Sequence, residues 1–244
     1  MKIALVGTGR MGRAVEALAF ERGHGVVARF NTQYPLAAAE DVSALHGADV
    51  VIDFSLPALA LGHINRYCQW NQAAVVGTTG WYEGLDQVRT WVAESETALL
   101  YAPNFSLGVA LLTRALRGLV PLLERLPEYD VAVHEAHHTG KVDSPSGTAL
   151  LLARVLLDGL SRKTRLETET QHQPIDPRAL HVTSSRLGSV FGEHTVYLDS
   201  PFDAITLSHQ AKNRRGFAFG ALKAAEWLPG RHGLFTLDDL LRSV

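Results

Sequence analysis

The chain has 244 residues, 46% hydrophobic and 20% charged, a composition typical of a soluble globular protein of about one or two domains. Its formal net charge of −2 excludes a global basic field for nucleic acid. The sequence has neither a signal-peptide pattern nor an apolar run of about 18 residues, so no membrane segment is expected. The single cysteine, Cys68, excludes an internal disulfide and a cysteine metal cluster and favours a reducing cytoplasm.

The first hundred residues alternate between short apolar runs and amphipathic stretches. The run 3–6 ends at a glycine, as buried parallel strands do, and apolar residues over 11–19 then recur at helical spacing. This alternation continues and predicts an α/β fold, a Rossmann-like doubly wound parallel sheet. The further elements expected are strands over 26–30, 48–54, 73–76 and 98–101 and helices over 57–68 and 82–94.

The pattern changes after residue 107. An apolar helix is expected over 109–123, bent or shortened by Pro121. Residues 161–178 are polar and contain two prolines, which predicts a surface loop. The remaining pattern indicates a smaller α+β domain with a mixed sheet, followed by two more helices. Its expected elements are strands near 129–135, 180–186, 190–198 and 203–210, a helix over 147–160, and the closing helices over 217–228 and 237–241.

A G-x-G-x-x-G motif follows the first strand directly: it is Gly7-Thr8-Gly9-Arg10-Met11-Gly12. Gly7 permits the tight turn, Gly9 lets the backbone approach a pyrophosphate, and Gly12 lets the helix and strand pack closely. The helix N-terminus then stabilises the phosphate charge. The alternative is an ordinary strand–helix turn. We expect a dinucleotide-binding domain over 1–107 and 214–244, and a substrate-binding and oligomerisation domain over 108–213.

The end of the second expected strand indicates which dinucleotide is used. An acidic residue roughly twenty positions after the glycine loop usually binds the ribose 2′-hydroxyl. Here the strand ends Ala28-Arg29-Phe30-Asn31, so the carboxylate is missing and Arg29 is available to face a 2′-phosphate. This predicts NADPH as the preferred cofactor, with NADH possible. The alternative is that Arg29 is a solvated strand end.

Three other loops follow strands of the same sheet. They begin at Phe54, Gly77 and Ala102. Because ligands bind beyond the carboxyl ends of parallel strands, we expect these loops and the glycine loop to form one crevice. Gly77 and Thr78 can contact a nicotinamide ribose, and Asn104 or the backbone near Phe105 can hold the carboxamide.

Proton-transfer groups cluster over 137–141. Histidine titrates near neutrality and suits general acid–base chemistry. His137 and His138 are adjacent, so on an extended backbone they point to opposite sides and take different roles. Lys141 supplies a fixed positive charge or a second proton donor. A metal site from Glu135, His137 and His138 is a weaker alternative because the spacing of a usual histidine metal motif is absent, so no metal is expected.

A helix start follows this cluster directly. The N–H groups of Gly147 and Thr148 have no partner within a helix that begins there, so they can hold a carboxylate. Ser146 is interpreted as a helix cap, because the strand–turn–helix context of a nucleophilic serine is missing. Together with the glycine loop, these residues indicate an enzyme that reduces a small acidic substrate.

The segment that contains these residues resembles the signature of the dihydrodipicolinate reductases, also called 4-hydroxy-tetrahydrodipicolinate reductases. It runs Glu135-Ala136-His137-His138-Thr139-Gly140-Lys141-Val142-Asp143-Ser144-Pro145-Ser146-Gly147-Thr148-Ala149. The resemblance covers nearly the whole chain. It departs at Ser144, where alanine is usual, and at the missing acidic residue after the second strand. The other motifs that recur in order are the loop 7–12 and the segments 53–55, 77–80, 104–109, 192–195, 217–218 and 220–221.

The resemblance implies an NAD(P)H-dependent reductase of the diaminopimelate and lysine pathway that makes tetrahydrodipicolinate. It implies a homotetramer built through the sheet of the second domain. By motif match, His137 resembles the proton donor/acceptor and Lys141 the second proton donor. His138, Gly147 and Thr148 resemble contacts to the substrate carboxylates. The implied cofactor contacts are the loop 7–12 with Gly77, Thr78, Thr79, Ala102, Pro103, Asn104, Phe105, Arg214 and Phe217.

Two other functions are compatible with part of the sequence. Another two-domain NAD(P)-dependent amino-acid dehydrogenase would explain the glycine loop but not the His-His-Lys segment. A non-catalytic NAD(P)-binding sensor would be expected to have lost its acid–base groups, yet His137 and Lys141 are both present. Either of these two side chains is a candidate for the proton that follows the hydride.

Overall fold

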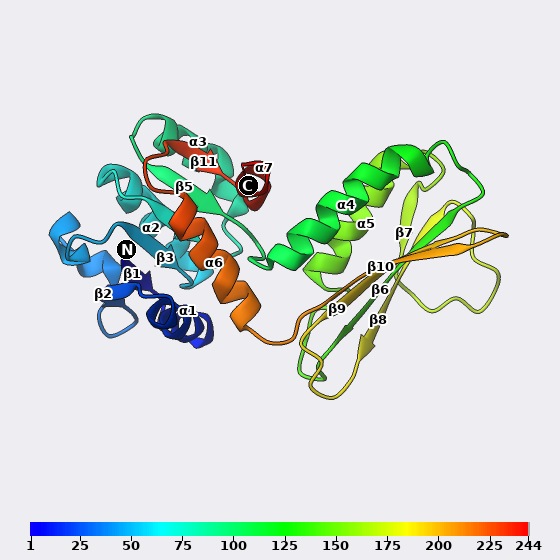
Figure 1. The fold of residues 1–244 in the computed structure, drawn as a ribbon, viewed down its shortest axis with the longest axis horizontal. Helices are drawn as coiled ribbons and strands as arrows, with labels where there is room; N and C mark the ends of the chain where they lie inside the picture. The colour runs from blue at the N-terminus through cyan, green and yellow to red at the C-terminus, as the bar shows by residue number, and fades with distance from the viewer. Residues whose placement is uncertain (244) are drawn as a thin grey trace. The chain divides into compact units, whose positions relative to one another are not determined.

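The computed structural model describes residues 1–243 and divides into two compact units, each with its own sheet and hydrophobic core (Figure 1). Unit 1 consists of Met1–Leu107 and Arg214–Val244, and unit 2 consists of Gly108–Asn213. Among residues 1–243, the structure contains no helix that is both long and apolar enough to span a membrane.

Unit 1 is built on a six-stranded parallel sheet with the order β11-β5-β4-β3-β1-β2. The strand order reverses between β1 and β3, which confirms the predicted doubly wound arrangement. The strands are β1 (Lys2–Val6), β2 (Gly25–Phe30), β3 (Val50–Asp53), β4 (Ala74–Val76), β5 (Ala98–Tyr101) and β11 (Gly233–Phe235). The helices are α1 (Arg10–Glu21), α2 (Pro57–Gln69), α3 (Leu85–Ala93), α6 (Arg215–Trp227) and α7 (Leu237–Arg242), with short 3-10 turns over Leu36–Ala38, Val42–Leu45 and Tyr82–Gly84.

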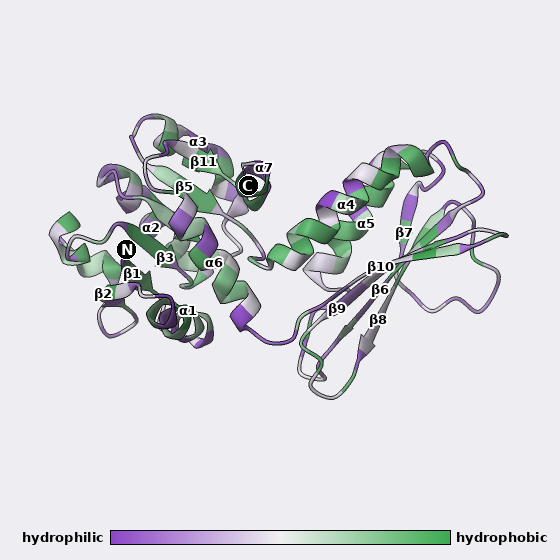
Figure 2. Ribbon diagram, in the orientation of Figure 1, coloured by the Kyte–Doolittle hydropathy of each residue, from purple (hydrophilic) through white to green (hydrophobic). Residues whose placement is uncertain are grey.

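The central strands of unit 1 are apolar along their length because helices cover both faces of the sheet. All of β3 is buried, and β3 and β5 are coloured mainly as hydrophobic in Figure 2. Two glycines permit close packing around this sheet. A Cβ at Gly12 would lie 2.0 Å from the Gly7 carbonyl oxygen, and one at Gly220 would lie 1.8 Å from the Phe105 carbonyl oxygen. These glycines therefore let α1 and α6 approach the loops that follow β1 and β5.

Unit 2 is a five-stranded mixed sheet with the order β10-β9-β6-β8-β7, covered on one face by two helices (Figure 1). β6 pairs parallel with β8 and antiparallel with β9. Residues of β6 alternate between buried and half-buried positions, as expected for a strand with one covered face. The elements are α4 (Leu107–Leu123), β6 (Asp130–His137), α5 (Gly147–Gly159), β7 (Arg165–Glu167), β8 (Ala179–Arg186), β9 (Glu193–Asp199) and β10 (Ala204–Gln210).

The structure corrects two expectations in unit 2. The stretch 161–178 is not entirely a loop, because Arg165–Glu167 forms β7 and pairs with β8. Lys163 stabilises this edge: its buried ammonium donates to the carbonyls of Pro177 and Ala179 at 2.8 and 2.9 Å. Pro121 does not shorten α4, which continues to Leu123. The proline removes one backbone hydrogen bond, and the packing of α4 offsets this loss, because Leu116, Val120 and Leu123 of the helix are buried.

Candidate functional site

The loops of unit 1 that were expected to form a crevice leave the sheet at one edge. Val6 pairs with Asp53, Asp53 with Val76, and Val76 with Tyr101. The loops that follow these four residues therefore begin side by side. Within them, the rings of Phe54 and Phe105 meet edge to face at 5.9 Å between centroids.

A pocket of about 570 Å³ opens at this edge. It is lined by Gly7, Thr8 and Gly9, by Asn31 after β2, and by Phe54 after β3, among others. Gly7 has φ +90°, and a Cβ there would lie 2.2 Å from the Phe54 carbonyl oxygen. Only glycine fits this turn, as the motif predicts.

The start of α1 has the properties of an anion site. Gly9 is its N-cap residue, no side chain caps the helix, and its first turn, which includes Arg10 and Met11, contains no acidic residue. A Cβ at Gly9 would meet nothing within 4 Å, so the backbone there is open to a ligand. The exposed helix N–H groups and the adjacent apolar pocket fit the pyrophosphate and an attached nucleoside of a dinucleotide.

A buried carboxylate that was not predicted as a site residue joins two of these loops. Asp53 is fully buried and accepts hydrogen bonds from the Ser55 N–H and the Thr78 hydroxyl, both at 2.9 Å. It also bonds Tyr67 at 2.8 Å and His63 at 3.0 Å. Burial raises the pKa of Asp53, but its hydrogen bonds, led by His63, outweigh this and hold the pKa below its ordinary value. The sequence signal was a carboxylate at the end of an otherwise apolar strand.

Arg29 contacts a neighbouring helix in this structure. Its Nε donates to Glu16 Oε1 at 2.8 Å and its Nη2 to the same oxygen, while the side chain is 49% exposed. The pocket wall after β2 is formed by Phe30, Asn31 and Thr32 instead. A 2′-phosphate would therefore have to draw Arg29 away from Glu16.

The remaining residues expected to bind cofactor also belong to unit 1. Ala102, Phe105 and Thr78 are buried, whereas Pro103 and Thr79 are exposed. Asn104 accepts the Ser106 N–H through its side-chain oxygen at 2.8 Å and so shapes its own loop. Gly77 lies against the Phe54 ring, where a Cβ would come within 2.1 Å. Arg214 is the N-cap residue of α6, and its carbonyl accepts the Phe217 N–H at 3.1 Å.

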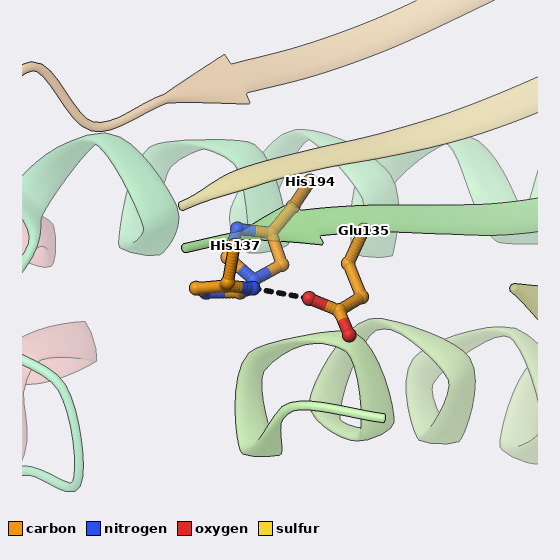
Figure 3. Close-up of side chains that lie close together, drawn as sticks. All are labelled: Glu135, His137 and His194. Carbon is orange, nitrogen blue, oxygen red and sulfur yellow. Dashed lines mark hydrogen bonds and ion pairs between the residues drawn. The ribbon is translucent and has the colours of Figure 1, made fainter. Parts of the chain in front are cut away.

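In unit 2, the histidine that was expected to move protons lies at the end of β6 (Figure 3). His137 is the last residue of this strand and is 7% exposed. Glu135, two residues earlier on the same face, is fully buried, and its Oε2 bonds His137 Nδ1. The other ring nitrogen, Nε2, faces Gly192, where a Cβ would lie 2.9 Å away. Nε2 is therefore the nitrogen that is left to exchange a proton.

Lys141 lies in the loop between β6 and α5. Its ammonium donates to Asp143 Oδ1 at 2.7 Å. The hydrogen bond from Lys141 lowers the pKa of Asp143, and the Gly147 N–H contributes in the same direction. Lys141, expected as a fixed positive charge or proton donor, and Gly147, expected to hold a substrate carboxylate, thus both interact with the carboxylate of Asp143. Thr148 follows as the second residue of α5, and His138 is half-buried directly after β6.

Ser146 caps α5, as predicted. Its hydroxyl accepts the Ala149 N–H at 3.2 Å and also bonds His194 Nε2 at 3.1 Å. His194 comes from β9, and its ring meets that of His137 edge to face at 5.1 Å between centroids. Burial lowers the pKa of His194 to about 4, and the nearby His137 adds to this effect. His194 is therefore neutral near physiological pH, a partner that only the motif over 192–195 signalled.

Several charges act on His137. Burial is the largest effect and lowers its pKa. Glu135 opposes this effect, whereas the positive charges of Lys141 and Arg186 add to it, and the resulting pKa lies below the ordinary value. The structure therefore brings His137 and Lys141 within electrostatic reach of one another.

Glu135, His137 and His194 each present a possible metal-ligand atom, all within 4.8 Å of one another. This set contains His194 in place of the His138 considered from sequence. Both oxygens of Glu135 already have partners, His137 Nδ1 and Arg186 Nη1, the latter at 2.9 Å. The guanidinium charge beside the carboxylate opposes a metal cation. The arrangement is therefore better suited to proton transfer than to metal binding.

Comparison with known sequences identifies the family of the chain. The family model described as dihydrodipicolinate reductase, N-terminus, matches residues 1–105, and the one described as its C-terminus matches residues 108–241. The chain is 36% identical over 244 residues to the 4-hydroxy-tetrahydrodipicolinate reductase of Christiangramia forsetii, covering 100% of this chain and 99% of the relative. It is 38% identical over 253 residues to that of Natronomonas pharaonis, covering 98% and 99%.

Solved structures show the same fold. The dipicolinate-bound dihydrodipicolinate reductase from Paenisporosarcina sp. TG-14 matches with a TM-score of 0.79 at 20% identity, covering 97% of each chain. A DAP dehydrogenase from C. glutamicum, in complex with DAP, matches with a TM-score of 0.55 at 17% identity, covering 99% of this chain and 98% of that one. The two-unit architecture is thus shared with other dehydrogenases, but the sequence relationship is to the reductases.

Proposed function

Because the chain belongs to the dihydrodipicolinate reductase family, we propose that it reduces (hydroxy-tetra)hydrodipicolinate to tetrahydrodipicolinate in diaminopimelate and lysine biosynthesis. It is an NAD(P)H-dependent oxidoreductase. The observation that carries the assignment is the buried pair of Glu135 and His137 with Lys141 nearby. A dehydrogenase of another class would not explain the His-His-Lys segment, and a sensor that only binds NAD(P) needs no acid–base groups.

Unit 1 is the proposed cofactor-binding domain. Its support is the open N-terminus of α1 and the pocket lined by Gly7, Thr8 and Gly9. The loops at 77–79 and 102–105, with Arg214 and Phe217, complete the proposed contacts. Asp53 holds Ser55 and Thr78 together and thereby orders this edge. When bound, the reduced nicotinamide supplies a hydride.

Unit 2 is the proposed substrate-binding domain. The dipicolinate in the related structure supports a small dicarboxylate as ligand. Lys141, His138 and the N–H groups of Gly147 and Thr148 would bind its carboxylates, with one carboxylate taking the place of Asp143. Reduction leaves an electron-rich, enamine-type ring carbon. His137 then donates a proton to it from Nε2, the nitrogen that does not contact Glu135.

An assay of cofactor oxidation tests this function. The absorbance of NADPH is followed with and without freshly generated dihydrodipicolinate precursor. We expect His137→Gln to lose mainly kcat, by about 100- to 10,000-fold, the usual contribution of a general acid. Lys141→Ala should lose kcat and also raise KM for the dicarboxylate. Near-normal turnover in both variants would contradict the assignment.

NADPH is the proposed preferred cofactor, with NADH as a possible second. The support is that the wall after β2 offers Asn31 and Thr32 but no carboxylate, while Arg29 lies on that strand. We expect a higher kcat/KM with NADPH, and Arg29→Ala should reduce it by about 10- to 100-fold without affecting NADH. Glu16→Gln is the matched control, since it frees Arg29 and should not weaken NADPH. A clear NADH preference of the unaltered protein would refute the proposal.

The family resemblance also supports a homotetramer formed through the sheet of unit 2. Its open face carries Ala132, His134 and Ala136 from β6 and Tyr197 from β9, none of which is fully buried. A cytoplasmic location stays a prediction, based on the single cysteine, Cys68, which is free and buried.

A further inference from the structure

A chain of charges with a fully buried carboxylate at its centre runs from β8 to the end of β6. Arg186 is the residue of β8 that pairs in register with His137. Its Nη1 donates to Glu135 Oε1 at 2.9 Å. Glu135 Oε2 bonds His137 Nδ1, as Figure 3 shows. Glu135 is fully buried, and a buried carboxylate without partners would cost several kcal/mol. Both of its oxygens are therefore used, one by the cation and one by the imidazole.

This arrangement determines which ring nitrogen of His137 carries a fixed proton. An ionised carboxylate can only accept hydrogen bonds, so Nδ1 must be the donor. Nε2 is then the atom that gains and loses a proton, and it is the nitrogen that faces Gly192. The other tautomer would leave two acceptors in contact inside a buried site, which is unfavourable.

We propose that Glu135 is a positioning residue for the reduction, which holds His137 as the Nδ1–H tautomer and directs Nε2 to the substrate, and that Arg186 fixes the orientation of Glu135 by binding its other oxygen. The proposal rests on the proposed function, in which His137 is the proton donor. It assigns Glu135 and Arg186 a role through His137, with no contact to substrate or cofactor required of either residue.

The charges around the pair support this division of roles. Burial raises the pKa of Glu135, but hydrogen bonds from Ser184, Arg186 and His137 outweigh it and leave the pKa below its ordinary value. Glu135 therefore stays anionic at working pH. Glu135 raises the pKa of His137, whereas Arg186 lowers it. The two partners thus act on His137 with opposite signs.

Arg186 also holds the loop that carries Lys141. Its Nη2 donates to the Asp143 carbonyl at 2.6 Å and its Nε to the Lys141 carbonyl at 3.4 Å. A change at Arg186 therefore disturbs both the charge and the loop. Glu135 acts through its charge and does not hold this loop, so a change at Glu135 provides the cleaner test.

Glu135→Gln is the main test, because it removes the charge and keeps the size. We expect kcat to fall by about 10- to 100-fold with KM for the dicarboxylate little changed. A general acid works while protonated, so kcat falls as pH rises through its pKa. Without the anion this pKa is lower, and the fall should move to lower pH. Glu135→Asp keeps the charge and should restore the wild-type pH profile.

A direct readout of the tautomer separates positioning from structural support. In protein with ¹⁵N-labelled histidine, the NMR shifts of His137 should show Nδ1–H alone in the wild type and a tautomer mixture in Glu135→Gln. Glu124→Gln is the matched control. Glu124 pairs with Arg162 at 3.6 Å, near Tyr129 and the opposite end of β6, so its loss should leave the pH profile and the tautomer unchanged.

Arg186→Met should shift the pH profile of kcat in the direction opposite to Glu135→Gln. Removing this cation raises the pKa of His137, so the fall in kcat should move to higher pH, and Arg186→Lys should restore the profile.

A wild-type tautomer and pH profile in Glu135→Gln would overturn the proposal even if the enzyme reduces its substrate. If wild-type protein fails to reduce the dicarboxylate, the proposed function is wrong, and the NMR result still decides the role of Glu135. If Glu135→Gln does not fold, the profiles of Glu135→Asp and Arg186→Met decide.

Discussion

At the end of β6, His137 lies between a carboxylate that raises its pKa and two cations that lower it. The identities of His137 and Lys141 were predictable because the residue types and their spacing are chemical signals within one segment. Their partners from other strands were not predictable from residue types: Arg186 and His194 come from β8 and β9, and sheet register brings them beside His137. Only the family motif over 192–195 drew attention to His194. Similarly, a strand end alone could not show that Arg29 pairs with Glu16.

Gly192 provides a test of access to Nε2. Its φ is +153°, and a Cβ there would lie 2.9 Å from His137 Nε2. We expect Gly192→Ala to displace the imidazole and lower kcat by about 100-fold, the effect of a misplacement of roughly 1 Å. Steady-state kinetics combined with thermal unfolding would separate this effect from a general loss of stability, expected at about 1–3 kcal/mol.

Gly188 is the control for that change. It lies in the same β8–β9 connection with φ +48°, and a Cβ there would meet nothing within 4 Å. Gly188→Ala should therefore cost about 1–2 kcal/mol of stability through backbone strain while retaining kcat. An equal loss of kcat in both variants would show that backbone strain, not contact with His137, is responsible.

At the level of elements, segments with a clear apolar pattern were predictable, and two short edge strands were not. Helices such as α2 and α5 present apolar residues at helical spacing, and β5 is a continuous apolar run. In contrast, β7 and β11 have three residues each and no alternating pattern long enough to detect. Both are edge strands that exist because a neighbour, β8 or β5, offers backbone hydrogen bonds.

At the level of the whole molecule, the chain forms two units with separate cores. Alternating strands and helices predicted the parallel sheet of unit 1, since each helix returns the chain to the same edge. The position of the pocket follows from the reversal of strand order at β1 and β3. The mixed sheet of unit 2 was predictable as a class only, because its order joins strands that are not neighbours in sequence.

The open sheet face of unit 2 leads to the prediction at this scale. Helices α4 and α5 cover one face, and within the described residues of unit 2 no helix covers the other (Figure 1). Tyr197 lies on that open face and is 44% exposed. We expect sedimentation velocity to show a tetramer and Tyr197→Glu to dissociate it. In a symmetric interface both subunits carry the substitution. The introduced carboxylates therefore either repel one another or are buried without a partner.

Leu150→Glu is the matched control for the oligomer. Leu150 is a similarly exposed apolar residue, 40% accessible, but it lies on α5 in the helical layer of unit 2. This variant should remain tetrameric, because the proposed interface is the sheet face and not the helices. A monomer for the unaltered protein at micromolar concentration would contradict the tetramer. A tetramer that survives Tyr197→Glu but not Leu150→Glu would move the interface from the sheet to the helices.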